Sequence, residues 1–207
     1  MSFYDRHVLP HLLDGLCGIG PIMDERAALI PRARGRVLEV GIGSGLNLRY
    51  YDAGKVGSIC GLDPAAEMQA LGRKRARRIA IPVEQVTLSA ETIVAPDASF
   101  DTVVSTFTLC TIPDAVAALR EMRRVLRPDG ELLFCEHGLA PEAGVQRWQQ
   151  RITPYWKPIA GGCHLDRPIP ELLAAGGFRI AELQQDYLRG PRPWTYLYRG
   201  VAVPASR

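Results

Sequence analysis

The chain has 207 residues, which is enough for one α/β domain and few for two. Its hydrophobic content of 47% and charged content of 23% are ordinary for a globular protein, and the formal net charge of +3 is too small to indicate a nucleic-acid partner. The five cysteines are widely spaced and form no C-x-x-C pair, which argues against a disulfide framework and against a zinc site.

The sequence also bears on location. No stretch approaches the ~20 apolar residues of a membrane span, and the N-terminus lacks the basic start and apolar core of a signal peptide. Unpaired cysteines suit a reducing compartment. We therefore expect a cytoplasmic protein without stable membrane insertion. The basic run at 73–78 is expected to be the solvated face of a helix.

Hydrophobic spacing predicts the elements in chain order. Residues 3–30 show helical spacing, broken into two short helices by Gly18, Gly20 and Pro21. Strands are expected at 37–40, 57–62, 83–88, 100–106, 131–136, 178–187 and 195–203. Helices are expected at 47–53, 66–79, 113–126 and 171–175, with turns at 95–99 and 127–130 and a loop at 188–194.

The alternation of strands and helices predicts the fold. Near-continuous apolar strands joined by helices are typical of a parallel sheet that is covered on both faces. The last two strands have no helix between them, so they must pair as a hairpin. We expect an α/β, doubly wound, Rossmann-like sheet of seven strands, mostly parallel with one antiparallel edge strand.

A glycine-rich turn follows the first strand in 36-RVLEVGIGSGLNL-48, with glycines at positions 41, 43 and 45. Such a turn brings the backbone close to a ligand, and a following helix offers its amides to an anion. The dinucleotide fingerprint would require Gly or Ala at Leu46. The alternative is a turn with a purely structural role.

Two acids flank this turn. Asp63 ends the second strand, 18 residues beyond Gly45, where its carboxylate can accept hydrogen bonds from ribose hydroxyls; alternatively it caps the helix that follows. Glu39 lies inside the first strand, where an unpaired carboxylate is costly to bury. A ligand ammonium would supply the missing charge, as the methionine part of S-adenosylmethionine does and NAD does not. The alternative is an ion pair with a nearby arginine such as Arg34.

The sequence resembles the class I S-adenosylmethionine-dependent methyltransferases, the family with a methyltransferase type 11 domain. The resemblance lies in LEVGIGSG, GLDPAAEM, SAETIVAPDASFDTVVSTFTLCTI and LREMRRVLRPDGELLFCEHG, within residues 38–138. FTLCTI, LLFCEHG, WQQRITPYWKPIAGGCHLDR and WTYLYRGVAV are similar to the small methyltransferase-like group that includes thiol S-methyltransferases. Asp129 departs from the usual R-P-G-G turn of the family, a change that should be tolerated. The mammalian members begin with a hydrophobic anchor that we do not expect here.

The resemblance implies roles for individual residues. S-adenosyl-L-methionine would be the cofactor and S-adenosyl-L-homocysteine the product. The methionine end would be lined by the turn and the first strand, the ribose by the end of the second strand, the adenine by residues 90–91, and the sulfonium by the end of the fourth strand. The implied cofactor residues are Glu39, Gly41, Gly43, Gly45, Asn47, Asp63, Pro64, Met68, Ala90, Glu91, Thr106, Phe107 and Leu109.

The sequence says less about the residues that bind the methyl acceptor than about those that bind the cofactor. A thiol acceptor must lose a proton, which a nearby imidazole can take. His137 follows the fifth strand and is the first candidate for contact with the acceptor; His164 is the second. Either histidine is alternatively a structural residue bonded to backbone. Cys110 and Cys135 are expected to be packed small side chains, and no metal-ligating set is visible.

Residues 1–207 are expected to form a single domain, with residues 1–30 as a helical lid and residues 140–170 as an acceptor-side insertion. Tyr4, Trp148, Tyr155 and Trp156 are expected to give an apolar wall there, or else to cover the sheet. We expect methyl transfer to a small, apolar acceptor, with a thiol as one candidate. The alternatives are a quinone- or phospholipid-type methyltransferase, a non-catalytic cofactor-binding protein, and an NAD-dependent oxidoreductase.

Overall fold

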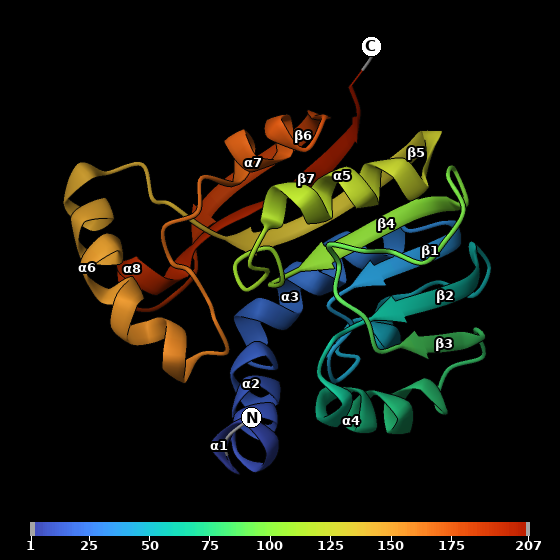
Figure 1. Ribbon diagram of the computed structural model, residues 1–207, viewed down its shortest axis with the longest axis horizontal. Coiled ribbons are helices and arrows are strands. Elements are labelled where there is room, and N and C mark those ends of the chain that lie inside the picture. Colours follow the sequence, from blue (N-terminus) through green and yellow to red (C-terminus); the bar gives the residue numbers. More distant parts are fainter. Residues whose placement is uncertain (1–2, 206–207) are drawn as a thin grey trace.

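The protein is described by a computed structural model that covers residues 3–205 (Figure 1). Residues 1–2 of the expected lid and residues 206–207 of the expected domain lie outside the described part. The strands form one seven-stranded sheet in the order β3-β2-β1-β4-β5-β7-β6. They are β1 (Gly35–Val40), β2 (Val56–Leu62), β3 (Val83–Val86), β4 (Phe100–Thr106), β5 (Leu126–His137), β6 (Phe178–Tyr187) and β7 (Tyr196–Pro204).

The expected sheet is confirmed. Strands β1 to β5 run parallel to one another, and β7 runs antiparallel to both β5 and β6. Strands β6 and β7 are the hairpin that was expected, and β7 is inserted between β5 and β6. The antiparallel strand β7 is therefore second from this edge of the sheet, with β6 outside it.

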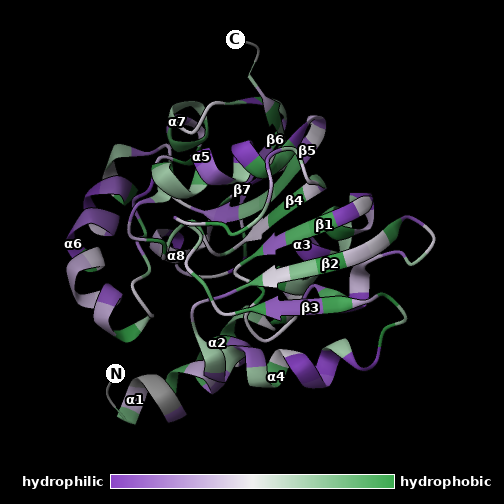
Figure 2. Ribbon diagram, turned by 45° about the vertical axis from the view of Figure 1, so that its right-hand side comes forward, coloured by the Kyte–Doolittle hydropathy of each residue, from purple (hydrophilic) through white to green (hydrophobic). Residues whose placement is uncertain are grey.

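Helices cover both faces, as expected. They are α1 (Phe3–His7), α2 (Leu9–Cys17), α3 (Gly20–Leu29), α4 (Ala66–Ala76), α5 (Ala115–Val125), α6 (Ala143–Ile159), α7 (Ile169–Ala175) and α8 (Arg192–Thr195), with 3₁₀ turns η1 (Ile30–Arg32) and η2 (Leu48–Tyr50). Helices α5 and α7 pack on the face that carries Leu38 and Val103. Helix α3 and both 3₁₀ turns pack on the opposite face, against Val37 and Val104. In Figure 2 the central strands are mostly hydrophobic, whereas α4 and α6 carry many hydrophilic residues.

The strand order places a ligand crevice between β1 and β4. From β1 the chain proceeds outward through β2 to β3, and it then returns to place β4 on the other side of β1. Where the chain leaves two neighbouring strands in opposite directions, their connecting loops separate, and ligands bind beyond the carboxyl ends. The glycine turn after β1 and the loop after β4 therefore face one crevice.

Several elements differ from expectation. Residues 3–30 form three helices, α1, α2 and α3, rather than two, and the expected loop at 188–194 includes the start of the short helix α8. The helix predicted at 47–53 is only the short turn η2, because the side chains of Asn47 and Tyr51 bond to the end of β1 and hold the chain in a tight curve. Strand β5 begins at Leu126 rather than at 131, because Leu126 already pairs with Phe100 and residues 127–130 form an irregularity within the strand. Residues 140–170, expected only as an insertion, contain the 17-residue helix α6. Among residues 3–205, no helix combines the length and the apolar composition needed to cross a bilayer.

Candidate cofactor cleft and acceptor site

The glycine turn needs its glycines for conformation and for space. Gly41, Gly43 and Gly45 have φ angles of 71°, 50° and 77°, a region that L-residues rarely adopt. A side chain at Gly41 would also overlap Thr108 in the loop after β4. The amides of Gly41 and Ile42 both donate to the carbonyl of Leu62, at 2.7 and 3.1 Å, and thus fix the turn to the end of β2.

Asp63 connects that turn to the next helix. Its Oδ2 accepts a hydrogen bond from the Gly43 amide at 2.9 Å, and its Oδ1 accepts one from the Ala65 amide at 2.8 Å. The cap position of α4 is Ala65, so the alternative role of Asp63 as helix cap is wrong. Burial raises the pKa of the Asp63 carboxyl, and the two backbone hydrogen bonds only partly oppose this. The carboxylate thus lies directly beside the glycine turn.

Glu39 is almost fully buried, with 2% of its surface exposed. Its two carboxylate oxygens accept hydrogen bonds from Asn47 Nδ2 at 2.9 Å and from the Tyr51 hydroxyl at 2.8 Å. Both donors are uncharged, and the alternative ion pair with Arg34 is not formed in the described part of the chain. Burial therefore raises the pKa of the Glu39 carboxyl to about 7, although both hydrogen bonds lower it.

Arg26 reaches this site from α3 on the lid side. Its NH1 donates to Asn47 Oδ1 at 2.7 Å and to Thr106 Oγ1 at 2.6 Å, and its guanidinium lies 5.1 Å from the centroid of the Phe107 ring. Its Nε is buried without a hydrogen-bond partner. A buried guanidinium with a spare donor, adjacent to the network of Glu39, is suited to a ligand carboxylate.

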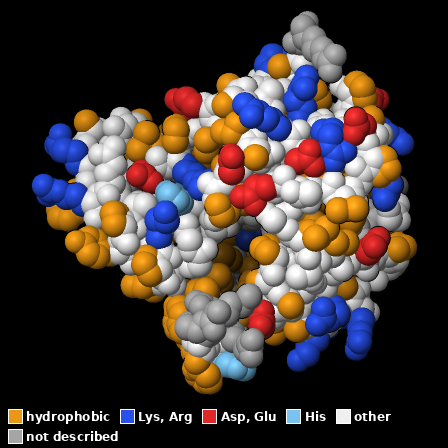
Figure 3. Space-filling view, in the orientation of Figure 1, with side chains coloured by type: hydrophobic (Ala, Val, Ile, Leu, Met, Phe, Trp, Pro, Cys, Tyr) orange, Lys and Arg blue, Asp and Glu red, His pale blue; other side chains and the backbone are white. Residues whose placement is uncertain are grey.

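These groups fit the cofactor that the resemblance implies. The spare donor of Arg26 suits the carboxylate of a methionine, Glu39 suits its ammonium, and Asp63 suits a ribose. All three reach the β1–β4 crevice from separate elements, namely α3, β1 and the end of β2. Figure 3 shows the surface hollowed where Figure 1 places the ends of β1 and β4 next to α3.

The remaining predicted cofactor residues surround the same turn or the loops beside it. Met68 on α4 packs against Gly43, with its methyl group 3.2 Å from the position that a Cβ would take. Glu91 Oε1 accepts a hydrogen bond from the Asp114 amide at 3.0 Å, which fastens the loop after β3 to the start of α5. Ala90 and Leu109 are buried in the core, and Pro64 follows Asp63 directly. Contact between these residues and an adenine or a sulfonium stays a prediction.

A second buried acid shapes the loop after β4. Glu136, near the end of β5, accepts hydrogen bonds from Ser105 Oγ at 2.8 Å and from the Thr108 amide at 2.9 Å. Burial raises the pKa of the Glu136 carboxyl. Next to this anchor Phe107 adopts a φ of +55°, which is uncommon for a bulky residue. The loop is therefore held in one bent conformation beside the crevice.

His137, at the end of β5, belongs to a cluster with two cysteines. Its Nε2 lies 3.0 Å from the Sγ of Cys163, and Cys110 completes a group whose three ligand atoms lie within 4.8 Å of one another. A hydrogen bond from Cys110 lowers the pKa of the Cys163 thiol, and His137 lowers it further. Burial opposes protonation of His137, but its hydrogen bond to Cys163 and the charges of Cys163 and Glu136 together outweigh burial and raise its pKa.

His164 lies outside this cluster. Its Nδ1 is 3.7 Å from Asp166 Oδ1, and burial and the charge of Arg167 lower its pKa. Its backbone N–H donates to the Cys110 carbonyl at 2.9 Å. The structure thus brings His137 together with two thiols, whereas His164 meets Cys110 through its backbone N–H. A role of either imidazole in the reaction stays a prediction.

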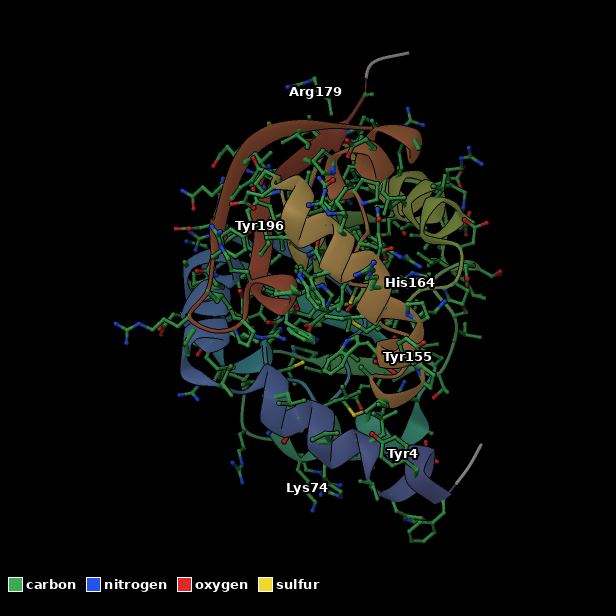
Figure 4. The ribbon with its side chains drawn as sticks, turned by 90° about the vertical axis from the view of Figure 1, so that its left-hand side faces the viewer. Tyr4, Lys74, Tyr155, His164, Arg179 and Tyr196 are labelled. Atoms are coloured by element: carbon green, nitrogen blue, oxygen red, sulfur yellow. The ribbon has the colours of Figure 1, made fainter. Side chains whose placement is uncertain are left out.

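The expected aromatic wall is only partly formed. Trp148 and Tyr155 are 59% and 78% exposed, because α6 turns them toward solvent, so for these two residues the expectation is wrong. Trp156 faces inward and packs against Trp194 near the cysteine cluster, with ring centroids 5.9 Å apart. The Tyr4 hydroxyl donates to the Ile159 carbonyl at 2.8 Å, and Figure 4 shows Tyr4 and Tyr155 on the same side of the molecule.

A polar link fastens α2 over the glycine turn. Arg75 NH1 on α4 bonds to Asp14 Oδ1 at 2.7 Å and to the Ser44 carbonyl at 2.7 Å. Arg75 belongs to the basic run that was expected to be a solvated helix face; for this residue the expectation is wrong. The N-terminal segment is therefore attached to the cleft from two sides, through Arg75 and through Arg26.

Four residues of the site were not predicted from the sequence: Arg26, Tyr51, Glu136 and Cys163. Two of them carry a recognisable signal. Arg26 stands on the apolar stripe of its helix, and Glu136, like Glu39, is an acid near the end of a buried strand. Tyr51 and Cys163 lie in loops without periodicity, and only the tertiary fold brings them to their partners.

Comparisons with known proteins identify a matching family and similar proteins. The family described as "Methyltransferase domain" matches residues 38–134. Thiol S-methyltransferase TMT1B of Homo sapiens is 34% identical over 174 residues, covering 78% of this chain and 67% of that protein. Phosphatidylethanolamine N-methyltransferase of Cereibacter sphaeroides is 36% identical over 158 residues, covering 75% of this chain and 76% of that protein. The chain spans about two thirds of the length of the thiol S-methyltransferases that it matches.

A solved structure shares the whole fold. The crystal structure of the [4+2]-cyclase SpnF superposes with a TM-score of 0.72 and 21% sequence identity, covering 98% of this chain and 94% of that one. At this identity the likeness concerns the fold alone. Activity must therefore be argued from the residues of the cleft.

Proposed function

The chain belongs to the class I S-adenosylmethionine-dependent methyltransferases, and on that premise we propose that it methylates a small, apolar thiol. The observation that carries the cofactor assignment is the placement of Arg26, Glu39 and Asp63 around one glycine turn. The cofactor supplies a methyl group that is already activated on a sulfonium, so the protein mainly has to bind, orient and exclude water.

Each residue of the cleft would bind a different part of the cofactor. The spare donor of Arg26 would hold the methionine carboxylate, and the ionised carboxylate of Glu39 would hold the ammonium. Asp63 would accept hydrogen bonds from the ribose while its bond to the Gly43 amide keeps it in place. The Phe107 backbone, bent by the loop that Glu136 anchors, would shape the space beneath the sulfonium.

The thiol preference is supported by chemistry on the acceptor side. His137, Cys110 and Cys163 form a polar cluster that is lined by Leu165, Ile152 and the Trp156–Trp194 pair. An apolar wall with a few polar groups suits a small lipophilic molecule. Since the reacting species is the thiolate, a group that favours loss of the thiol proton would accelerate the reaction.

The two segments that flank the sheet core would cover the cofactor and bind the acceptor. Residues 3–30 would act as the lid, because they supply Arg26 and are fastened through Asp14. Residues 140–170 would form the acceptor side, because they supply Cys163 and the inward-facing Trp156. The five free cysteines suit a reducing compartment, and we propose a cytoplasmic location.

N-methylation of a phospholipid is the second candidate, favoured by the similarity to the bacterial phosphatidylethanolamine N-methyltransferase. An amine acceptor needs its nitrogen unprotonated, but it does not need a cluster of sulfur and imidazole. The acceptor side of this chain therefore favours the thiol.

A transfer assay separates these functions. Purified protein is incubated with methyl-labelled cofactor and, in parallel, with an alkyl thiol, a hydroquinone, a phenol, an amine and phosphatidylethanolamine. We expect label on the alkyl thiol. Label on phosphatidylethanolamine alone would establish the second candidate, and cofactor binding without label on any acceptor would mean a non-catalytic binding protein. His137→Ala should slow transfer without weakening cofactor binding, as measured by calorimetry.

A further inference from the structure

The cluster of Cys110, His137 and Cys163 has the composition of a soft-metal site. Its ligand atoms come from three separate places: the loop after β4, the end of β5 and the loop after α6. Cys110 and His137 each form a hydrogen bond with Cys163. Two thiolates and one imidazole are ligands that zinc prefers. We propose that these three side chains bind one zinc ion, whose fourth position takes the sulfur of the acceptor, a role that rests on the proposed thiol methylation.

The distances suit a tetrahedral ion. Zinc binds sulfur at about 2.3 Å and nitrogen at about 2.0 Å, so ligands around it lie about 3.5–4 Å apart. All three atoms already lie within 4.8 Å of one another, and only small side-chain rotations are needed to surround an ion. Among the described residues, no fourth His, Cys, Asp or Glu joins the group. Three protein ligands with an open fourth position are typical of catalytic rather than structural zinc.

The surrounding backbone holds the ligands together. The His164 amide donates to the Cys110 carbonyl at 2.9 Å, which joins the two loops that carry the cysteines. Arg167 donates to the carbonyls of Leu109 and Ile112 on either side of Cys110. The loop of Cys110 is therefore held at three carbonyls, those of Leu109, Cys110 and Ile112. Such pre-organisation is what a metal site requires of its supporting residues.

The position of the cluster relates it to methyl transfer. Cys110 follows Phe107 by three residues in the loop that bends into the crevice, and His137 follows the buried Glu136 that anchors this loop. A thiol bound as fourth ligand would release its proton to solvent and remain as a zinc-bound thiolate. Its sulfur would form the new bond to the methyl carbon while the carbon–sulfonium bond breaks and its electron pair stays on the departing sulfur. The neutral thioether product would then leave the ion.

Cobalt provides a direct test with a spectroscopic signal. Protein stripped with a chelator is titrated with Co²⁺, which replaces zinc in tetrahedral thiolate sites and absorbs visible light there. We expect about one cobalt per chain, with thiolate-to-cobalt charge-transfer bands, displacement by zinc, and a spectral shift on addition of an alkyl thiol. Cys163→Ser and Cys110→Ser should lose the bands, whereas Cys60→Ser should keep them. Cofactor affinity measured in parallel shows whether each variant is folded.

Activity of the metal-free protein adds a second measurement. A thiol with a pKa of about 8.5 is only about 3% ionised at pH 7, so loss of the ion should slow its methylation about 30-fold at that pH and progressively less toward pH 9.

Absence of cobalt binding in the wild-type chain, or bands that persist in both cysteine variants, would overturn the site. A spectrum insensitive to thiols, together with full activity of the metal-free protein, would overturn its role with the acceptor. A thiol-sensitive spectrum without methyl transfer to any acceptor would support the site and refute the proposed function instead.

Discussion

Cofactor affinity should rise with pH through about 7, because Glu39 must be ionised to hold an ammonium group. Burial raises the pKa of this carboxyl from 4.5 to about 7, so below pH 7 the free protein carries a proton that cofactor binding must release. If this group alone titrates, the dissociation constant at pH 6 is about eight times that at pH 7.5. An α-amino group stays mostly protonated over this range, so the ligand itself contributes little.

The variant Glu39→Gln should change stability and cofactor affinity in opposite directions. The pKa difference between 4.5 and about 7 corresponds to roughly 3 kcal/mol, the cost of keeping this buried carboxyl ionised. A raised pKa means that this group stabilises the folded protein below pH 4.5 and that the contribution is lost as the pH rises to 7. At pH 8 the free variant should therefore be more stable by up to about 3 kcal/mol. Its cofactor affinity should fall about ten- to a hundredfold.

Calorimetric titration with S-adenosylhomocysteine between pH 6 and 7.5 measures the cofactor affinity. Urea unfolding measures the free energy of unfolding. Glu84→Gln on the exposed side of β3 serves as the matched control and should change neither. Affinity that is independent of pH in the wild-type protein, or variant affinity equal to that of the wild type, would refute the assignment of Glu39 to the ammonium.

Three further changes test the rest of the cleft. Asp63→Ala should weaken cofactor binding by about 1–3 kcal/mol in calorimetry; unchanged affinity would mean that the ribose lies elsewhere. Gly41→Ala should lower the free energy of unfolding by about 2 kcal/mol or more, from its positive φ and the overlap with Thr108, and a thermal shift near zero would contradict this. Arg75→Ala should cost less than about 1 kcal/mol of stability yet speed chymotryptic cleavage within residues 3–30, whereas Arg77→Ala should not; equal cleavage rates would argue against a fastened lid.

Much of the fold follows from local patterns. Strand β4 has the bounds that its apolar run predicts, and the glycine turn and Asp63 meet as their positions at the strand ends predict. These features depend on periodicity and on the rule that parallel strands present their carboxyl ends at one edge. Glu39 was recognisable because an acid in a buried strand conflicts with its surroundings.

The rest of the site depends on contacts between distant segments. Arg26 meets Asn47 and Thr106, which follow it by 21 and 80 residues, and no local spacing encodes such a meeting. Cys163 reaches His137 only because the loop after α6 returns to the end of β5. The exposure of Tyr155 could not be predicted from the sequence either. A helix that lies outside the alternating core can turn its aromatic side chains toward solvent or toward the protein.

The insertion of β7 between β5 and β6 has a consequence for synthesis on the ribosome. Strand β7 is the last of the seven strands in chain order, yet it occupies an interior place in the sheet. Until β7 has emerged from the ribosome, β5 is left with an unpaired edge and β6 has no partner, and such edges invite pairing with other chains. A nascent or truncated chain that lacks β7 should therefore depend on chaperones, and the sheet closes only once β7 has been made.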